Sequence, residues 1–387
     1  MAGTTYSSRE LIDRLIAYDT TSRDSNLELI GFVQDYLKGW GIDSLLIPNE
    51  DGSKANLYAT VGPDDRGGIV LSGHTDVVPI DGQDWSSDPF SVVERDGRLF
   101  GRGACDMKAF IAIALARVPD LAGKNLSTPI HFALSYDEEV GCLGVQPMVK
   151  HIKEHLPLPS IVIVGEPTDM TVVNAHKSGH RFVTEVNGLE GHSSMTHLGV
   201  SAILMAGELL GEISRMAEEY KNHPSCDHRF EPPYTTLHVG LIEGGTATNI
   251  IPKHCRFEWE ARGVPGFEPE EVVERLRGFA EKHLLPKMHA VSKETGIEIW
   301  HDQFVPALWP QDGSPAETLV MALARQNETH AVSYQTEAGY FQQIDIPTVI
   351  CGPGSIKQAH KPDEFVSLEQ VALCDQFMDR LVQHVSV

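Results

Sequence analysis

Four short apolar segments of this chain each lead into a histidine or a carboxylate, and this pattern constrains the fold more than any other feature of the sequence. The segments span residues 68–73, 129–134, 161–165 and 348–351. Short apolar runs bounded by glycine or polar turns are typical of buried strands in a parallel sheet. The carboxyl ends of such strands meet at one edge of an open α/β sheet, where ligands bind. The sequence therefore predicts a polar site built from strand ends.

Five residues at or near these strand ends are candidate metal ligands. Four follow the apolar segments and the fifth lies in a glycine-bounded loop; they are His74, Asp106, Glu139, Glu166 and His360. Mixed imidazole and carboxylate donors suit a pair of divalent cations such as zinc, cobalt or manganese. Such a pair is typical of hydrolytic enzymes. The pattern therefore indicates a metal-dependent hydrolase.

Further carboxylates accompany these candidates. Asp76 follows His74 by two residues, where it can accept the second ring N–H and fix the histidine tautomer. Asp137, Glu138 and Glu139 form an acidic run whose mutual repulsion is relieved by cations or by solvent. One of these glutamates can bind metal while its neighbour serves as a base. Each motif alone also fits a solvated turn, but their joint occurrence at strand ends favours the metal site.

Composition limits the class of protein. A chain of 387 residues favours two domains, and its net charge of −23 argues against nucleic acid or an anionic membrane as the main partner. The six cysteines are scattered, which fits neither a disulfide framework nor a thiolate zinc site. The sequence shows no secretory signal pattern and no apolar run near the roughly 20 residues that span a bilayer. These features predict a cytoplasmic protein.

The character of the chain changes near residue 180 and changes back near residue 290. Strands and helices alternate up to about residue 175, which is typical of a layered α/β domain. The middle segment has a β-α-β-β-α order, which predicts a ferredoxin-like α+β sandwich. Since the candidate ligands flank this segment, both ends must fold together. We predict a catalytic three-layer α/β/α domain with a mostly parallel sheet (1–179 and 291–387), interrupted by an inserted dimerisation domain (180–290).

Several motifs are shared with a known enzyme family. They span residues 72–79, 85–90, 101–108, 137–139, 165–168, 191–194 and 262–266. The chain resembles, over its full length, the dinuclear zinc amidohydrolase and metallopeptidase family that includes acetylornithine deacetylase, succinyl-diaminopimelate desuccinylase, aminoacylases and glutamate carboxypeptidases. Within this family, residues 336–342 and 351–364 are most similar to the acetylornithine deacetylase subgroup. Ala109 departs from the glycine that the family commonly has there.

The resemblance implies a role for each metal ligand. Two divalent ions are expected, zinc by resemblance, with cobalt as the alternative. Asp106 would bridge the two ions. His74 and Glu166 would complete one site, and Glu139 and His360 would complete the other. The resemblance also implies a cis peptide bond after Asp106, which persists only where its surroundings enforce it.

Three catalytic roles follow from the same resemblance. Glu138 would be the general base and acid, which takes a proton from water and returns it to the leaving amine. Asp76 would orient His74. His192, in the inserted segment, would donate a hydrogen bond to the oxyanion, either from a partner subunit or by closure of the insertion. The alternative for His192 is a surface turn without a catalytic role.

Substrate-binding residues are implied in the same way. Asn249 and Arg262 match positions that hold the substrate carboxylate or amide in relatives, and arginine suits bidentate carboxylate binding. Glu337 is a candidate for the δ-ammonium group of ornithine, and Gly354 is a further candidate contact. The alternatives are a turn residue for Asn249, a strand-end charge for Arg262 and a loop-ordering carboxylate for Glu337.

The predicted activity is hydrolysis of N2-acetyl-L-ornithine to L-ornithine and acetate in arginine biosynthesis. Alternatives within the same chemistry are another N-acyl-amino acid, succinyl-diaminopimelate or a dipeptide. A non-enzymatic metal-binding protein is a different class, which the presence of Glu138 disfavours, since holding metal requires no base. The exposed sheet edge of the inserted domain is expected to form a homodimer contact.

Overall fold

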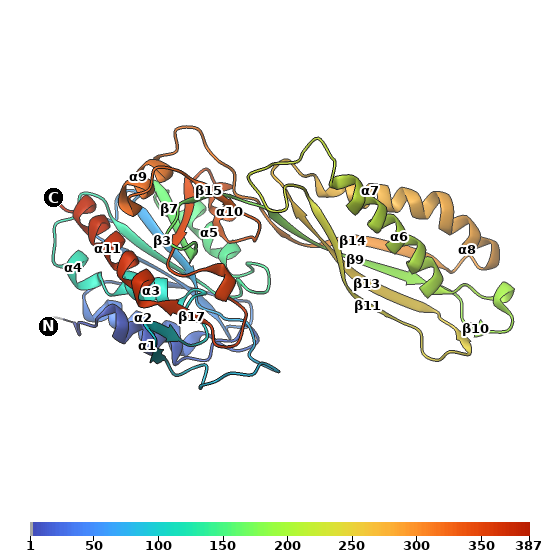
Figure 1. The fold of residues 1–387 in the computed structure, drawn as a ribbon, viewed down its shortest axis with the longest axis horizontal. Coiled ribbons are helices and arrows are strands. Elements are labelled where there is room, and N and C mark those ends of the chain that lie inside the picture. The colour runs from blue at the N-terminus through green and yellow to red at the C-terminus, as the bar shows by residue number, and fades with distance from the viewer. Residues whose placement is uncertain (1–2) are drawn as a thin grey trace. The chain divides into compact units, whose positions relative to one another are not determined.

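The computed structural model describes residues 3–387, which form two compact units (Figure 1). Unit 1 contains the chain up to Ala175 together with Leu308–Ala331 and Thr336–Val387, and unit 2 contains His176–Ala307 and Val332–Gln335. The boundary expected at residue 290 lies too early. Strand β14 (Gly296–Val305) pairs with β9 (Ser178–Asn187) along its whole length, so it belongs to unit 2.

An eight-stranded sheet runs through unit 1, in the order β1-β2-β6-β3-β7-β16-β8-β15. Its central strands β6, β3, β7 and β16 are parallel, and the pairs β1–β2, β2–β6 and β16–β8 are antiparallel. The sheet is therefore mixed, with the predicted parallel part at its centre. The strands are β1 (Ser44–Pro48), β2 (Ala55–Val61), β3 (Ile69–His74), β6 (Ile130–Ser135), β7 (Ile161–Pro167), β8 (Val173–His176), β15 (His330–Val332) and β16 (Thr348–Gly352).

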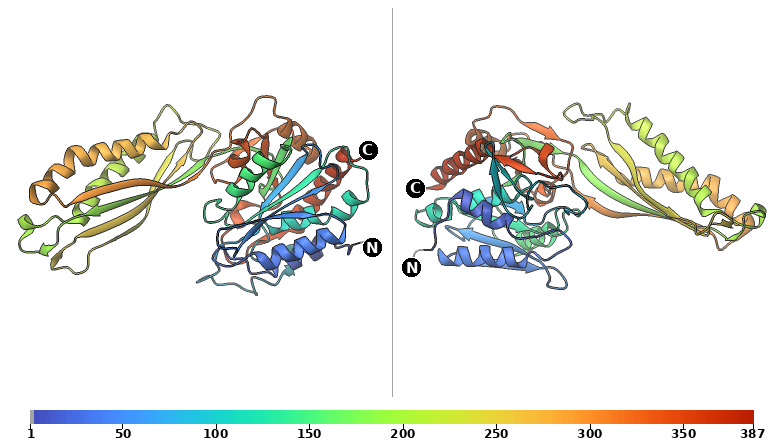
Figure 2. Two further views of the ribbon diagram at one scale, coloured as in Figure 1. Left: turned by 180° about the vertical axis from the view of Figure 1, so that it is seen from behind. Right: turned by 60° about the horizontal axis from the view of Figure 1, so that its bottom comes forward.

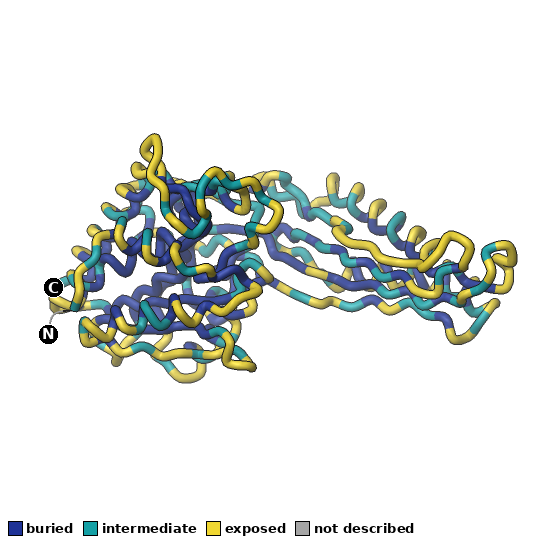
Figure 3. The backbone as a smooth tube through the Cα atoms, turned by 90° about the horizontal axis from the view of Figure 1, so that it is seen from below, coloured by how far each residue is buried: buried dark blue, intermediate teal, exposed yellow. Residues whose placement is uncertain are grey.

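Helices flank this sheet, which confirms the predicted layered fold (Figures 1 and 2). Every residue of β3, β6 and β7 is buried, as Figure 3 shows for the interior of unit 1, so both faces of the central strands are covered. The helices are α1 (Ser8–Ile16), α2 (Leu27–Gly39), α3 (Lys108–Leu115), α4 (Val118–Ala122), α5 (Val145–His155), α9 (Pro315–Ala324), α10 (Ala338–Gln342) and α11 (Leu368–Val385), with a 3₁₀ turn at Ile356–Gln358.

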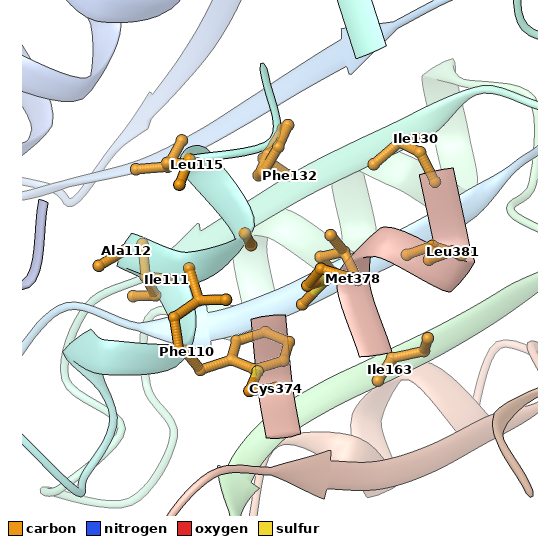
Figure 4. Close-up of a cluster of buried hydrophobic side chains, with 14 of the residues drawn as sticks. Phe110, Ile111, Ala112, Leu115, Ile130, Phe132, Ile163, Cys374, Met378 and Leu381 are labelled. Atoms are coloured by element: carbon orange, nitrogen blue, oxygen red, sulfur yellow. The ribbon is translucent and has the colours of Figure 1, made fainter. Parts of the chain in front are cut away.

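The main core of unit 1 packs α3 and α11 against the sheet (Figure 4). All residues of α3 are buried, as expected for a helix that is apolar on every side. Side chains on a strand alternate between faces, and the core-facing residues of β6 are Ile130, Phe132 and Leu134. This packing makes a rigid support for the strand ends. The side chains shown include Phe110, Ile111, Leu115, Ile163, Cys374, Met378 and Leu381.

A small three-stranded sheet joins two loops of unit 1. It consists of β4 (Val93–Arg95), β5 (Arg98–Phe100) and β17 (Phe365–Ser367), in the order β17-β5-β4. β17 begins five residues after His360, and β5 ends six residues before Asp106. The sheet therefore anchors the two loops that carry these predicted ligands.

Unit 2 is the predicted α+β sandwich. Its antiparallel sheet has the order β11-β13-β9-β14, with β11 (Thr236–Gly244) and β13 (His254–Gly263). Apolar residues alternate along β13 and pack beneath the helices. A short ladder joins β10 (Gly191–His192) to β12 (Ile250–Ile251). The helices are α6 (Ala202–Tyr220), α7 (Pro269–Phe279) and α8 (Leu285–Val291), with a 3₁₀ turn at Thr196–Leu198 and a π-helical turn at Ala280–Leu284.

Candidate metal centre

The five predicted ligands gather at one edge of unit 1. His74 is the last residue of β3, Glu166 is the penultimate residue of β7, and Glu139 follows the end of β6. Asp106 lies in the loop before α3, and His360 lies in the loop between β16 and β17. Because β6, β3 and β7 are parallel neighbours, their carboxyl ends bring the side chains together.

Asp106 lies at the centre of this cluster. Its Oδ1 is 3.0 Å from Nε2 of His74, and its Oδ2 is 3.4 Å from Nε2 of His360. His74 is also 3.7 Å from Oε1 of Glu166, and His360 is 3.0 Å from Oε2 of Glu139. Each oxygen of Asp106 therefore faces a different histidine, which divides the cluster into a His74 half and a His360 half.

The donor set fits divalent cations. Ligand atoms of His74, Asp106 and Glu139 lie within 4.8 Å of one another, and so do those of His74, Glu138 and Glu166. Burial, against the effect of the nearby His74, raises the pKa of Glu138 to about 8. Burial and the charge of Asp106 raise the pKa of Glu139 to about 7. Carboxylates crowded in this way gain from bound cations, and mixed nitrogen and oxygen donors suit zinc-like metals.

Asp76 contacts both His74 and the acidic turn after β6. Nδ1 of His74 lies 2.9 Å from the backbone oxygen of Asp76 and 3.5 Å from its Oδ1. The carboxylate accepts hydrogen bonds from the backbone N–H groups of Glu138 (3.1 Å) and Glu139 (3.3 Å), and from the Ser22 hydroxyl (2.7 Å). The main chain of Asp76 is thus the nearest partner of the imidazole, while its carboxylate mainly holds the acidic turn.

Glu138 is held by its own turn as well. Its backbone oxygen accepts hydrogen bonds from the N–H groups of Gly141 and Cys142, both at 2.9 Å. The thiol of Cys142 donates to Oε1 of Glu138 across 3.3 Å. Sequence reasoning did not single out Cys142, although it follows the acidic run by three residues. The side chain of Glu138 therefore has a fixed support from within the turn.

Glu364 holds the loop that carries Asp106. Its Oε1 accepts hydrogen bonds from the N–H groups of Cys105 (2.8 Å) and Asp106 (3.0 Å). Its Oε2 accepts from Nη1 of Arg102 at 2.7 Å, and both charged side chains are only 1% exposed. Arg102 also donates to the backbone oxygen of Lys361 at 3.3 Å. Neither residue of this ion pair was predicted, although both lie in motifs of the predicted site.

The structure tests two expectations about the chain next to Asp106, namely the cis peptide bond and the alanine at position 109. The peptide bond between Asp106 and Met107 is cis, as expected. Ala109 lies in the first turn of α3 and is completely buried in the core. The departure from the family pattern is therefore accommodated inside the apolar core.

Three predicted site residues belong to unit 2. His192 is exposed at the end of β10, and the backbone N–H of Ser194 donates to its Nδ1 at 3.2 Å. Asn249 lies beside it, because its backbone oxygen accepts from the N–H of Ser193 at 3.1 Å. Arg262 lies near the end of β13 and pairs with Glu260 at 3.0 Å. Unit 2 thus brings together His192 and Asn249.

The remaining two predicted residues lie in unit 1. Glu337 is 0% exposed, and the hydroxyls of Ser72 (2.5 Å) and Ser135 (2.7 Å) donate to its two oxygens. Gly354 has a φ of +89°, and a Cβ atom there would lie 2.7 Å from Sγ of Cys105. Glycine is therefore required at this position, because any side chain would collide with the loop before Asp106.

No helix among residues 3–387 has both the length and the apolar character needed to cross a bilayer.

This chain is similar over nearly its whole length to two bacterial acetylornithine deacetylases. The chain is 34% identical to the acetylornithine deacetylase of Myxococcus xanthus over 395 residues, which cover 99% of each chain. It is 33% identical to the acetylornithine deacetylase of Pasteurella multocida (strain Pm70) over 382 residues, or 96% of each chain.

Both the fold and the sequence of this chain match one family of metallopeptidases. The fold is similar to that of the Bacillus subtilis YXEP protein, described as a dinuclear metal binding peptidase from the M20 family, with a TM-score of 0.68 and 16% identity. This similarity covers 98% of this chain and 97% of the other. Residues 70–384 match the peptidase family M20/M25/M40. This chain is therefore a member of peptidase family M20/M25/M40.

Proposed function

We propose that this protein is a metal-dependent amidohydrolase that cleaves N2-acetyl-L-ornithine into L-ornithine and acetate. The observation that carries this proposal is the cluster in which the buried Asp106 faces His74 with one oxygen and His360 with the other. Glu138, which is left over when the five predicted ligands are assigned to two ions, has a carboxylate oxygen within 4.8 Å of ligand atoms of His74 and Glu166. The two full-length relatives named above direct the choice of substrate.

The cluster would hold two divalent ions, for which we propose zinc, with cobalt as the alternative. His74 and Glu166 would complete one site with Asp106, and Glu139 and His360 would complete the other. Such ions lower the pKa of water and polarise a carbonyl group when they are bound. Asp106, central in the cluster, would be shared by both sites.

Glu138 would carry the proton. Its carboxylate takes a proton from the attacking water, whose oxygen adds to the acetyl carbonyl carbon. The same group then gives the proton to the amine nitrogen of ornithine as the C–N bond breaks. The contacts from Asp76 and Cys142 support this role, since they fix the backbone and one oxygen of Glu138.

We place three residues of unit 2 at the substrate. Since the backbone N–H and the hydroxyl of Ser194 lie 3.2 and 2.8 Å from Nδ1 of His192, we propose that the ring donates through its Nε2–H. That N–H is the group that would stabilise the oxyanion. Asn249, adjacent to His192, and Arg262 would bind the amide and the carboxylate of the substrate, and Gly354 in unit 1 is proposed as a backbone contact.

We also propose a homodimer formed through unit 2. β11 is an outer strand of the sheet, and its Leu241 and Ile242 are 62% and 51% exposed. Leu204 on α6, which packs on β11, is 67% exposed. An unpaired strand edge beside exposed apolar side chains is typical of a subunit contact. Sedimentation of the wild type as a monomer alone would reject this proposal.

A cytoplasmic location is proposed on the state of the cysteines. All six, which lie within the described residues, are free thiols, and five of them are buried. Unpaired buried thiols are typical of proteins in a reducing compartment.

A hydrolysis panel tests the proposed activity. It compares acetylornithine with other N-acetyl-amino acids, succinyl-diaminopimelate and a dipeptide, with added zinc or cobalt, by measuring amine release. We expect acetylornithine to have the highest kcat/KM. Preference for another compound would reject the substrate, and no hydrolysis of any compound by metal-loaded protein would reject the enzyme.

A further inference from the structure

Glu337 is a buried carboxylate that no step of the proposed reaction uses. It directly precedes α10 and is 0% exposed. Its Oε1 accepts a hydrogen bond from Oγ of Ser72 at 2.5 Å, and its Oε2 accepts one from Oγ of Ser135 at 2.7 Å. Each oxygen therefore already has a short hydrogen bond inside unit 1, which is poorly suited to binding a substrate ammonium group.

The two serines lie at the strand ends that carry the metal centre. Ser72 precedes His74 by two residues on β3, so their side chains point to the same face of the sheet. Ser135 is the last residue of β6, lies opposite His74 in the parallel register, and precedes Glu138 by three residues. The Glu337 carboxylate thus contacts both β3, which carries the ligand His74, and β6, which leads to the proposed base Glu138.

Glu337 also connects these strands to a third part of the chain. It belongs to the segment Thr336–Val387, which supplies His360 as well. The helix that follows Glu337 packs against α5, β7 and β16. The carboxylate therefore adds side-chain contacts between β3, β6 and the start of α10, beside the backbone ladders that join β6, β3, β7 and β16.

We propose that Glu337 is a positioning residue for the metal centre, and that it fixes the spacing between His74 and the turn of Glu138 and Glu139 through Ser72 and Ser135. This inference rests on the proposed function for the roles of the residues that it positions. It differs from the expectation that Glu337 binds the δ-ammonium group. Residues that orient ligands from behind typically contribute a factor of about 10–100 in metal affinity or activity.

Zinc affinity, measured by competition with a chelator, tests the proposal without substrate. Glu337→Ala should weaken zinc binding about 10–100-fold, and the Ser72→Ala/Ser135→Ala variant should weaken it in the same direction. Combining all three changes should add little, because the groups act as one unit. Glu337→Gln, which keeps the shape and one acceptor, should retain more affinity than Glu337→Ala.

Glu317→Ala is the matched control. Glu317 is a carboxylate of unit 1 whose Oε1 accepts a hydrogen bond from Asn174 at 3.0 Å, outside the metal cluster. Its loss should leave zinc affinity unchanged. If Glu337→Ala shows no cooperative unfolding, it is not folded and its zinc affinity is uninformative. The Ser72→Ala/Ser135→Ala variant, which removes only two hydroxyls, then tests the proposal by its own loss of zinc affinity.

Kinetics with two substrates separate the positioning role from substrate binding. N2-acetyl-L-norleucine carries a methyl group where acetylornithine carries the ammonium group. A positioning role lowers kcat on both by the same factor. A rise in KM for acetylornithine alone, with unchanged zinc affinity, would overturn the proposal, and so would unchanged zinc affinity and kinetics. If the wild type hydrolyses neither compound, the proposed function fails while the zinc measurement still tests Glu337.

Discussion

The two histidines of the metal centre have very different surroundings. His74 ends a buried strand with its side chain 1% exposed, whereas the side chain of His360 is 55% exposed in a loop. His360 also has a φ of +63°, a conformation that is uncommon for residues other than glycine. The sheet therefore fixes the His74 half of the centre, and loop contacts must fix the His360 half.

Polar contacts take the place of the sheet in the His360 half. The backbone oxygen of His360 accepts a hydrogen bond from Nε2 of Gln83 at 3.2 Å. Asp363 accepts from both the N–H and the hydroxyl of Ser86 at 2.9 Å. Next to them, Glu364 binds the backbone of Asp106. The His360 half therefore depends on a few side-chain hydrogen bonds between loops, whereas the sheet holds the His74 half.

The largest expected effect on metal content and hydrolysis comes from replacing each of the two histidines by alanine. His74→Ala should lose both metal ions and all measurable hydrolysis, because it removes the buried, sheet-held partner of Asp106, the ligand that both proposed sites share. His360→Ala should retain one ion, because the His74 half is built on the sheet. Metal analysis of the purified variants together with turnover checks this prediction. Equal metal loss in both variants would contradict the difference between the two halves.

Glu138→Gln should lower kcat by about 10²–10⁴-fold, the range of general acid–base catalysis. Both metal ions should remain, because Glu138 serves as the base while the two halves keep their own ligands. Metal content and kcat are measured on the same preparation. Loss of metal together with activity would instead show that Glu138 is a metal ligand of the His74 half. Such a role is sterically open to it, since a carboxylate oxygen of Glu138 lies within 4.8 Å of ligand atoms of His74 and Glu166.

Arg102→Ala tests the support of the loop half. It leaves the buried carboxylate of Glu364 without its charged partner, and such a change typically costs about 3–5 kcal/mol. The free energy of unfolding in urea checks this cost. Arg9→Ala is the control, since Arg9 and Glu94 form an ion pair with side chains 36% and 51% exposed, and exposed pairs contribute about 0–1 kcal/mol. Equal losses would mean that burial does not strengthen the loop pair.

The strands and most candidate ligands could be predicted because their signals are local. An apolar run followed by a histidine or carboxylate is visible in the sequence, and parallel pairing then brings His74, Glu139 and Glu166 together. The boundary at residue 290 was wrong because the partner of β14 lies more than a hundred residues earlier. Local alternation marks a strand but does not identify the sheet that it joins.

The supporting residues could not be predicted because their roles come from burial and long-range contacts. Glu364 looks like an ordinary loop carboxylate in the sequence, and the sequence predicts substrate binding for Glu337, yet both are almost completely buried. The partners of Glu337 lie 265 and 202 residues away. Likewise, the sequence predicts that the Asp76 carboxylate accepts from His74, whereas its backbone oxygen is the nearer partner and its carboxylate accepts from the Glu138 turn instead.

The smallest expected effect concerns Cys142, whose thiol contacts Glu138 in the His74 half of the centre. Its thiol donates to Oε1 of Glu138 across 3.3 Å, and a thiol is a weak donor. Loss of one such bond is worth about 0.5–1.5 kcal/mol, so Cys142→Ala should lower kcat about 2–10-fold. Cys142→Ser, which keeps a donor, should recover most of this loss. Unchanged kcat in Cys142→Ala, at full metal content, would show that the acidic turn alone holds Glu138 in place.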